Sequence, residues 1–227
     1  MGKAGKITPS DEMDCAKKIS GRRRNSFDKC STTFAGMKIG LFFGSFNPVH
    51  TGHLIIANHL ATRSELDRVW MVISPQNPLK PKKGMARDFD RLHLVRLGIG
   101  DNPLLEASNV EFALPKPSYT VDTLIHLRER YPQHEFALIM GGDNLATLHL
   151  WKNYEQILAH HDIYVYQRPQ YDLGALATHP RVRLCEAPLL DISATYIRQC
   201  IKDGHSIRYL VPDAVCDYLE QGSMYRD

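Results

Sequence analysis

The stretch that decides the fold is MKIGLFFGSFNPVHTGH, residues 37–53. Its apolar run at residues 39–43 ends at Gly44 and is typical of a strand buried in a parallel sheet. Helical spacing of apolar side chains begins at residue 53 and continues to residue 63. The sequence therefore predicts a strand, a loop and a helix, and the loop carries two histidines three positions apart.

The same alternation of strand and helix continues along the rest of the chain. We expect Ser193 to be the N-cap of the helix that it begins. Strands separated by helices imply right-handed crossovers, so the expected fold is α/β, a Rossmann-like, doubly wound parallel sheet flanked by helices in a single domain. Ligands of such sheets bind at the carboxyl ends of the strands. The predicted strands are residues 68–74, 104–110, 135–140, 162–166 and 182–185, and the predicted helices are residues 87–98, 120–130, 154–159, 193–202 and 212–220.

Composition excludes several classes of protein. The chain has 227 residues, of which 43% are hydrophobic and 23% charged, so it can bury a core without disulfide or metal staples. No run approaches the ~20 apolar residues of a membrane span, and no solenoid or coiled-coil repeat is visible. The five cysteines are odd in number and lack CxxC spacing, which indicates reduced thiols in a cytoplasmic protein.

The positive charge of the protein lies in its first 36 residues. This segment holds eight basic and four acidic residues, whereas residues 37–227 are close to neutral and disfavour a large nucleic-acid-binding face. It also lacks the apolar region of a secretory signal. We expect residues 1–36 to be a disordered or cloning-derived leader before a natural start at Met37. A transit segment and a basic arm for an anionic partner are the alternatives.

The loop between the first strand and the first helix is the strongest candidate for a binding site. His50 and His53 straddle Gly52, and the helix that starts there directs free N–H groups and its positive dipole end into the same crevice. Gly44 and Gly52 allow a close approach of the backbone to a ligand. This set of donors suits phosphate oxygens. A two-histidine metal site and merely packed histidines are the alternatives.

Two segments resemble a known superfamily. Residues 44–53 are similar to the signature of the HxGH nucleotidyltransferases, whose members join a nucleoside triphosphate to a phosphate-bearing acceptor and release pyrophosphate. Residues 192–198, ISATYIR, resemble the ISSTxIR motif of the same superfamily, with Ala194 in place of its second serine. Hydroxyls at a helix start and an arginine one turn on can grip a polyphosphate. An ordinary capped helix is the alternative.

Four further segments resemble one branch, the bacterial nicotinate-nucleotide adenylyltransferases. Residues 117–124 read PSYTVDTL, and Trp151 follows Asp143 by eight positions, as in the GxDxxxxxxxW pattern of that family. Residues 74–80 and 167–169 occupy the places of its loops after the second and fifth strands. The resemblance extends from Met37 to about Leu219 and covers none of the leader.

The resemblance implies adenylyl transfer from ATP to nicotinate mononucleotide, which gives deamido-NAD and pyrophosphate in NAD biosynthesis. It implies Mg²⁺ as the companion of ATP, no metal site on the protein, and no nucleic acid or membrane partner; a homo-oligomer is compatible with the sequence. The implied catalytic residues are His50, His53 and Arg198. The implied ATP-binding residues are Gly44, Ser45, Phe46, His50, His53, Gly141, Asp143, Ser193, Thr195 and Arg198, and those for nicotinate mononucleotide are Asn77, Lys80, Tyr119, Thr120, Trp151 and Arg168.

These residue types suit the implied substrates. An aromatic platform such as Trp151 suits the flat, electron-poor nicotinate ring, although packing is the alternative. Backbone donors around Tyr119 and Thr120 would bind the carboxylate of the ring, and Asp143 would accept from ribose hydroxyls. Lys80, in a proline-rich loop, would close over phosphates. Since a phosphate is already a good nucleophile, catalysis would consist mostly of positioning and charge stabilisation.

Four rival functions stay open at this point. Another nucleotidyltransferase, such as the pantetheine-phosphate or glycerol-phosphate enzyme, would share the first and last motifs. An enzyme that prefers nicotinamide mononucleotide differs only in the backbone donors that choose carboxylate over carboxamide. A non-catalytic nucleotide sensor, or an RNA-binding protein that uses the basic leader, belongs to a different class.

Overall fold

A six-stranded parallel sheet forms the centre of the computed structural model, which describes residues 36–75, 84–167, 173–188 and 190–226. The strand order is β3-β2-β1-β4-β5-β6, so the order reverses between β1 and β4. The predicted doubly wound, Rossmann-like fold is confirmed, and the reversal marks the place where such sheets bind ligands. The strands are β1 (Lys38–Gly44), β2 (Arg68–Ile73), β3 (Leu105–Ser108), β4 (Glu135–Gly141), β5 (Ile163–Tyr166) and β6 (Val182–Cys185).

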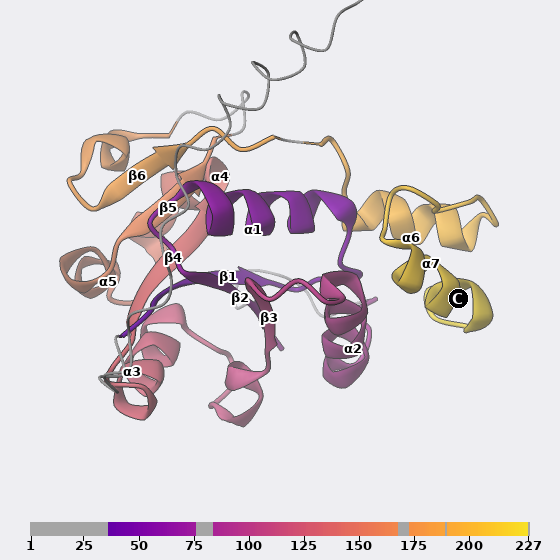
Figure 1. Ribbon diagram of the computed structural model, residues 1–227, viewed down its shortest axis with the longest axis horizontal. Helices are drawn as coiled ribbons and strands as arrows, with labels where there is room; N and C mark the ends of the chain where they lie inside the picture. The colour runs from indigo at the N-terminus through magenta and orange to yellow at the C-terminus, as the bar shows by residue number, and fades with distance from the viewer. Residues whose placement is uncertain (1–35, 76–83, 168–172, 189, 227) are drawn as a thin grey trace, which may run out of the picture. The chain divides into compact units, whose positions relative to one another are not determined.

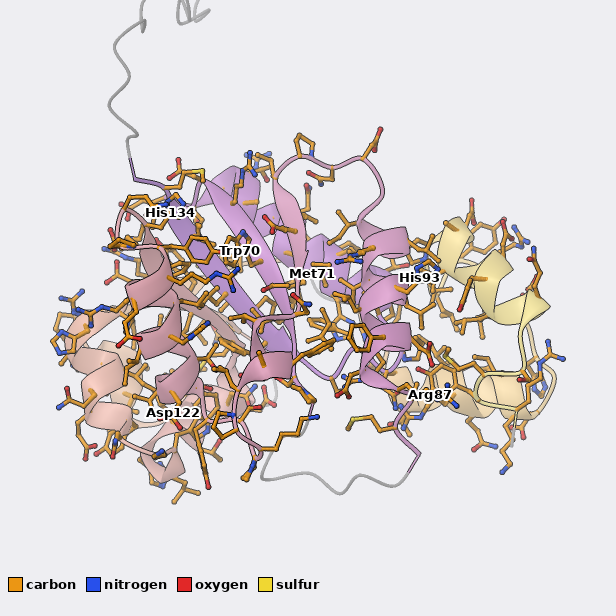
Figure 2. All side chains as sticks on the ribbon, turned by 90° about the horizontal axis from the view of Figure 1, so that it is seen from below. Trp70, Met71, Arg87, His93, Asp122 and His134 are labelled. Atoms are coloured by element: carbon orange, nitrogen blue, oxygen red, sulfur yellow. The ribbon has the colours of Figure 1, made fainter. Side chains whose placement is uncertain are left out.

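Both faces of the sheet are covered by apolar side chains, as continuous apolar strands require. Leu41 of β1 pairs with Trp70 of β2, and both belong to one core cluster. The next pair, Phe42 and Met71, belongs to a second cluster on the opposite face. Figure 2 labels Trp70 and Met71 on β2, between the helices that cover the two faces. Alternate side chains of each central strand therefore build two separate cores.

Different helices cover the two faces. Figure 1 shows α1 and α3 on opposite sides of the sheet, and α6 and α7 next to one end of α1. The face of Phe42 is packed by α1 (Thr51–Arg63), α2 (Asp88–Ile99), α6 (Ala194–Lys202) and α7 (Asp213–Gln221). The face of Leu41 is packed by α3 (Thr120–Arg130), α4 (Gly142–Ala146) and α5 (Tyr154–His160).

The predicted elements are all present, with differences at their ends. The third strand ends at Ser108, because the chain turns into the 3-10 helix η1 (Val110–Ala113). The Oγ of Ser193 accepts a hydrogen bond from the Tyr196 N–H at 3.2 Å, so Ser193 is the N-cap of α6 as predicted. The short elements contain too few residues for a period and were not predicted: η1, α4, η2 (Leu148–Leu150) and η3 (Ala175–Thr178).

The described residues, from Gly36 onward, form one compact unit. The prediction of a leader at residues 1–36 stays a prediction, because residues 1–35 lie outside the described part. The three cysteines of the described part, Cys185, Cys200 and Cys216, are free thiols, as expected. Within the same residues, none of the helices combines the length and the apolar character needed to cross a bilayer.

Candidate active site

The loop that leaves β1 is supported from inside the core by Phe46. This side chain is 1% exposed, and its backbone φ is 42°. A Cβ at Gly44 would lie 2.7 Å from the Phe46 ring, so only glycine lets the ring fold back over the end of the strand. The ring packs edge-on against His53, with 5.0 Å between the ring centroids. The side chain of Phe46 therefore supports a histidine instead of lining an open surface.

His50 and His53 form a stacked pair at the start of α1. Their ring centroids are 3.6 Å apart and their planes differ by 26°. The backbone N–H of His50 donates to Nδ1 of His53 at 3.3 Å. A nitrogen that accepts carries no proton, so the neutral ring of His53 holds its proton on Nε2. This tautomer makes Nε2 a hydrogen-bond donor, which suits a phosphate oxygen.

The start of α1 is less open than the sequence predicted. The N–H of Thr51 donates to the carbonyl of Leu210 at 3.0 Å, so this donor of the first turn is already paired. A Cβ at Gly52 would lie 3.2 Å from the His50 ring. The glycine thus makes room for a histidine of the same loop. The helix thus begins one residue before the predicted start near Gly52, and the N–H of that extra residue, Thr51, is not available to a ligand.

Arg198 joins the second motif to the first. Its Nη1 donates to the carbonyl oxygen of Asn47 at 2.7 Å, and its Nη2 donates to Oγ1 of Thr195 at 3.2 Å. The structure therefore brings Arg198 and Thr195 of α6 to the loop that carries the two histidines. The hydroxyl of Ser193 is engaged as the N-cap of the same helix.

Gly141 and Asp143 lie at the end of β4, next to β1 in the sheet. A Cβ at Gly141 would collide with Oδ1 of Asp143 and would lie 3.2 Å from the Tyr166 ring. Tyr166 in turn packs edge-on against Phe42, with 6.0 Å between centroids, and Phe42 lies 6.1 Å from the His53 ring. Ring contacts therefore link Tyr166, at the end of β5 beside Gly141, to His53.

Tyr119, Thr120 and Trp151 form a second group at the same edge of the sheet. Tyr119 and Trp151 pack on the core cluster that contains Leu41. The Nζ of Lys152 lies 4.7 Å from the centroid of the Tyr119 ring and 2.9 Å from the carboxylate of Asp122. Lys152 thus fixes the start of α3, where Thr120 is the first residue.

Two polar groups of this second group are buried and unpaired within the described residues. They are Nε1 of Trp151 and Oγ of Ser118. Buried donors without a partner are rare in folded proteins, because each costs free energy. A ligand that supplies acceptors here would remove that cost. The family pattern indicated Trp151 as a ring platform, whereas nothing in the sequence indicated a role for Ser118.

A buried carboxyl group of η1 is hydrogen-bonded to α3. Glu111 of η1 is 2% exposed, and its Oε1 accepts from the Thr123 hydroxyl at 2.8 Å. The hydroxyl of Thr123 also lies 3.4 Å from the carbonyl of Tyr119. Burial raises the pKa of Glu111, and its hydroxyl contacts only partly oppose that shift.

Asn47 connects three separate segments, although its side chain had no predicted role. Its Nδ2 donates to the carbonyl of Gly84 at 3.0 Å. Its Oδ1 accepts from the Ala86 N–H at 3.0 Å and from the Tyr225 hydroxyl at 2.7 Å. The side chain is 6% exposed, so it holds the loop from within. No local pattern predicts these contacts, since the three partners are 37 or more positions away in the chain.

Comparison with known proteins agrees with this arrangement. The cytidylyltransferase-like family matches residues 41–200. A probable nicotinate-nucleotide adenylyltransferase of Cytophaga hutchinsonii is 56% identical over 189 residues, which cover 83% of this chain and 98% of the relative. A protein of the same name from Flavobacterium johnsoniae is 51% identical over 192 residues, covering 84% of this chain and all of the relative.

The chain belongs to the nicotinate-nucleotide adenylyltransferase family. A solved structure of nicotinic acid mononucleotide adenylyltransferase from Plasmodium falciparum, complexed with NaAD, matches 83% of this chain and 97% of its own, with a TM-score of 0.70. Its sequence identity is 18%, so this likeness supports the fold alone. The predicted resemblance to nicotinate-nucleotide adenylyltransferases is confirmed.

Some expected site residues of this adenylyltransferase cannot be placed. Asn77, Lys80 and Arg168 lie outside the described residues, and their roles stay predictions. In the described ranges, no three His, Cys, Asp or Glu side chains are grouped so that they could hold a metal ion. The two groups that the structure does assemble are the histidine group of β1, α1 and α6 and the Tyr119–Trp151 group.

Proposed function

We propose that this enzyme transfers the adenylyl group of ATP to nicotinate mononucleotide, giving deamido-NAD and pyrophosphate. One observation carries the proposal: Arg198 reaches the carbonyl of Asn47 and so joins, at the carboxyl end of β1, the two motifs that we propose bind phosphate. Imidazoles, a helix start and a guanidinium gather there, next to the reversal in strand order. The family and the names of its relatives supply the choice of acceptor.

The reaction is an in-line displacement at the α-phosphorus of ATP. A phosphate oxygen of nicotinate mononucleotide forms the new P–O bond, and the bond to the β-phosphoryl oxygen breaks. The electron pair of that bond leaves with pyrophosphate. His53 donates from Nε2 to an oxygen on the reacting phosphate, and Arg198 stabilises charge on the polyphosphate. Fixed donors of this kind lower the barrier because they need no reorganisation when charge develops.

The ATP side of the site comprises the ends of β1 and β4. Gly44 and Ser45 open the loop of His50, and Asp143 of α4 is the proposed acceptor for ribose hydroxyls. Ser193 and Thr195 contribute through the start of α6. Phe46 acts by supporting His53. Mg²⁺ enters as the counter-ion of ATP, held by phosphate oxygens and water.

The acceptor side comprises the start of α3 and Trp151. Nicotinate carries a carboxylate, and the N-terminal turn of α3 presents N–H groups and a positive dipole end to such a group. Tyr119 and Thr120 belong to this turn, and the indole of Trp151 offers a face and an N–H. Asn77, Lys80 and Arg168 complete the proposed subsite. Since a carboxamide lacks the negative charge, we expect the acid to be preferred over the amide.

The cytoplasm is the proposed compartment. The reaction consumes ATP, and Cys185, Cys200 and Cys216 are free thiols, as expected of a reducing compartment.

The proposed function is tested by pyrophosphate release with MgATP and three acceptors in parallel: nicotinate mononucleotide, nicotinamide mononucleotide and 4′-phosphopantetheine. We expect strong release with the first acceptor and little with the other two. Equal release with nicotinate mononucleotide and nicotinamide mononucleotide would contradict the proposed role of α3 in the choice of acceptor. Release with phosphopantetheine alone, or silence with all three acceptors from folded protein, would reject the proposal.

A further inference from the structure

Arg91 is a buried arginine to which no role in binding or catalysis has been assigned above. It lies in the first turn of α2, and its side chain is 0% exposed. Figure 2 labels Arg87 just before this helix and Asp122 near the start of α3, at the same edge of the sheet. A fully buried guanidinium is expensive unless its donors are paired. Its partners therefore indicate what the residue does.

The guanidinium of Arg91 bonds to carbonyls of three chain segments. Its Nη1 donates to the carbonyls of Ser45 and Ser74, the latter at 3.1 Å. Its Nε donates to the carbonyl of Ala86 at 3.2 Å, and its Nη2 pairs with Asp88 at 2.8 Å. Ser45 follows β1 and Ser74 follows β2, so one rigid side chain ties the ends of two neighbouring strands together.

Ser74 continues this connection toward α3. Its hydroxyl lowers the pKa of the buried Glu111 carboxyl, whose Oε1 accepts from the Thr123 hydroxyl. The hydroxyl of Thr123 reaches back to the carbonyl of Tyr119. A series of interactions thus runs from the loop of the two histidines, through Arg91 and Ser74, to the segment proposed to hold the nicotinate carboxylate.

We propose that Arg91 is a positioning residue that holds the ATP side of the site in register with the acceptor side. The inference rests on the proposed function and deepens it. Joining two bound substrates demands that the attacking oxygen and the α-phosphorus lie within about 3–3.5 Å of each other. Each substrate alone needs only its own loop. Arg91 therefore matters for the reaction between the substrates more than for the binding of either one.

The geometry of the guanidinium is essential to this role. Arginine presents five donors in a planar fork, whereas lysine presents one point charge on a flexible stem. Lysine at position 91 would keep the charge but could not span Ser45, Ser74 and Ala86 together. Methionine would fill similar space and lose every donor. Comparing the two variants separates the effect of the positive charge of Arg91 from the effect of its planar set of donors.

The test compares Arg91→Met and Arg91→Lys with the wild type in single-turnover pyrophosphate release. The dissociation constant of each substrate alone is measured by calorimetry, and the folded fraction by thermal unfolding. We expect the rate per folded molecule to fall about 100-fold in both variants, as for a misplacement near 1 Å. The dissociation constants of MgATP alone and nicotinate mononucleotide alone should change little. Arg96→Met, on an exposed position of the same helix, is the matched control and should retain the wild-type rate.

Ser74→Ala provides a second measurement if Arg91→Met does not fold. It leaves Arg91 in place and removes the hydroxyl that interacts with Glu111, so we expect the same pattern with a smaller loss of rate. In the double variant Ser74→Ala/Arg91→Lys, the loss of rate, expressed as a free energy, should be smaller than the sum of the two single losses, because both substitutions disrupt the same connection. A normal rate in folded Arg91→Met, or full rescue by lysine, would overturn the inference. So would a loss that appears entirely as weaker binding of one substrate. Silence of the wild type would instead reject the proposed function.

Discussion

Nη1 of Arg198 lies 2.7 Å from the carbonyl oxygen of Asn47, 151 positions earlier in the chain. This hydrogen bond places a guanidinium from α6 beside the loop that leaves β1. A charged donor gives a shorter and stronger bond than a neutral one. The last part of the chain therefore completes a site that begins at the end of the first strand. Removing the side chain of Arg198 should impair that site more than it impairs the fold.

Replacing Arg198 tests this relationship. We expect Arg198→Met to lower kcat/KM by a factor of about 10²–10³, the usual loss for one donor aimed at developing charge. Stability should fall by only about 1–3 kcal/mol, because the side chain is half-buried and loses two hydrogen bonds. Steady-state kinetics and thermal unfolding measure the two effects. Arg208→Met, which removes an exposed arginine from loose pairs with Asp213 and Asp217, is the control.

His53 is expected to be the stronger of the two catalytic tests. His53→Ala removes the proposed Nε2 donor while the fold stays intact. We therefore expect turnover to fall by the factor that corresponds to a loss of about 3 kcal/mol of transition-state stabilisation. Pyrophosphate release and circular dichroism are the measurements. His59→Ala, on the same helix and without an assigned role, should leave turnover unchanged. Near-normal turnover in folded His53→Ala would contradict the assignment.

The sequence predicted those features that local patterns encode. The central strands are short apolar runs, and all six strands were predicted. The loop of His50 and His53 was evident because a strand and a helix flank it. The third strand was drawn too long, since Val110 continues its apolar character while the chain has already turned into η1. Five-residue α4 follows β4 without a loop and has no period of its own.

Contacts that depend on tertiary structure could not be predicted from local patterns. An arginine in the first turn of a helix normally faces water, so nothing marked Arg91 as buried. Glu111 and Thr123 are paired only because η1 lies beneath α3. Lys152 follows Trp151 directly, yet its contact with Tyr119 requires α3 and the segment before α5 to meet. The proximity of Arg198 to the histidine loop was implied only by family resemblance.

Glu111 should make the stability of the protein fall as pH rises. Burial raises its pKa, so between the unfolded-state pKa of about 4.3 and the higher folded-state value the folded protein binds more protons. In that window its contribution falls by up to about 1.4 kcal/mol per pH unit. Glu111→Gln keeps an acceptor for Thr123 and cannot ionise, so its stability relative to the wild type should increase with pH.

Urea unfolding at pH 4, 6 and 8 measures this difference. Glu106→Gln, on an exposed position of β3, should follow the wild type at each pH. If the free energies of unfolding of Glu111→Gln and the wild type differed by the same amount at all three pH values, burial would not set the pKa of the Glu111 carboxyl.

Asp162 should have the opposite pH dependence, at the amino edge of the sheet. Its side chain is 9% exposed, and it contacts Lys38 at 2.7 Å, Arg181 at 3.3 Å and Arg183 at 3.6 Å. Burial alone would raise the pKa of Asp162, but the bond from Lys38 and the arginine charges hold it below its ordinary value. The stabilisation is complete above the unfolded-state pKa of about 3.9 and is lost as pH falls through the lower folded-state pKa.

We expect Asp162→Asn to lower the free energy of unfolding by about 1.5–3 kcal/mol at pH 7, as for hydrogen bonds to charged groups. The difference from the wild type should shrink once the pH falls below 4, because the wild-type carboxyl then takes up a proton as well. Urea unfolding at pH 7 and at pH 3 measures both values. Glu135→Gln is the control: Glu135 lies 3.5 Å from the same Lys38 but its side chain is 61% exposed, so its loss should cost less than about 1 kcal/mol. If Asp162→Asn and Glu135→Gln lowered the free energy of unfolding equally, burial of Asp162 would add nothing to the stabilisation that its ion pairs provide.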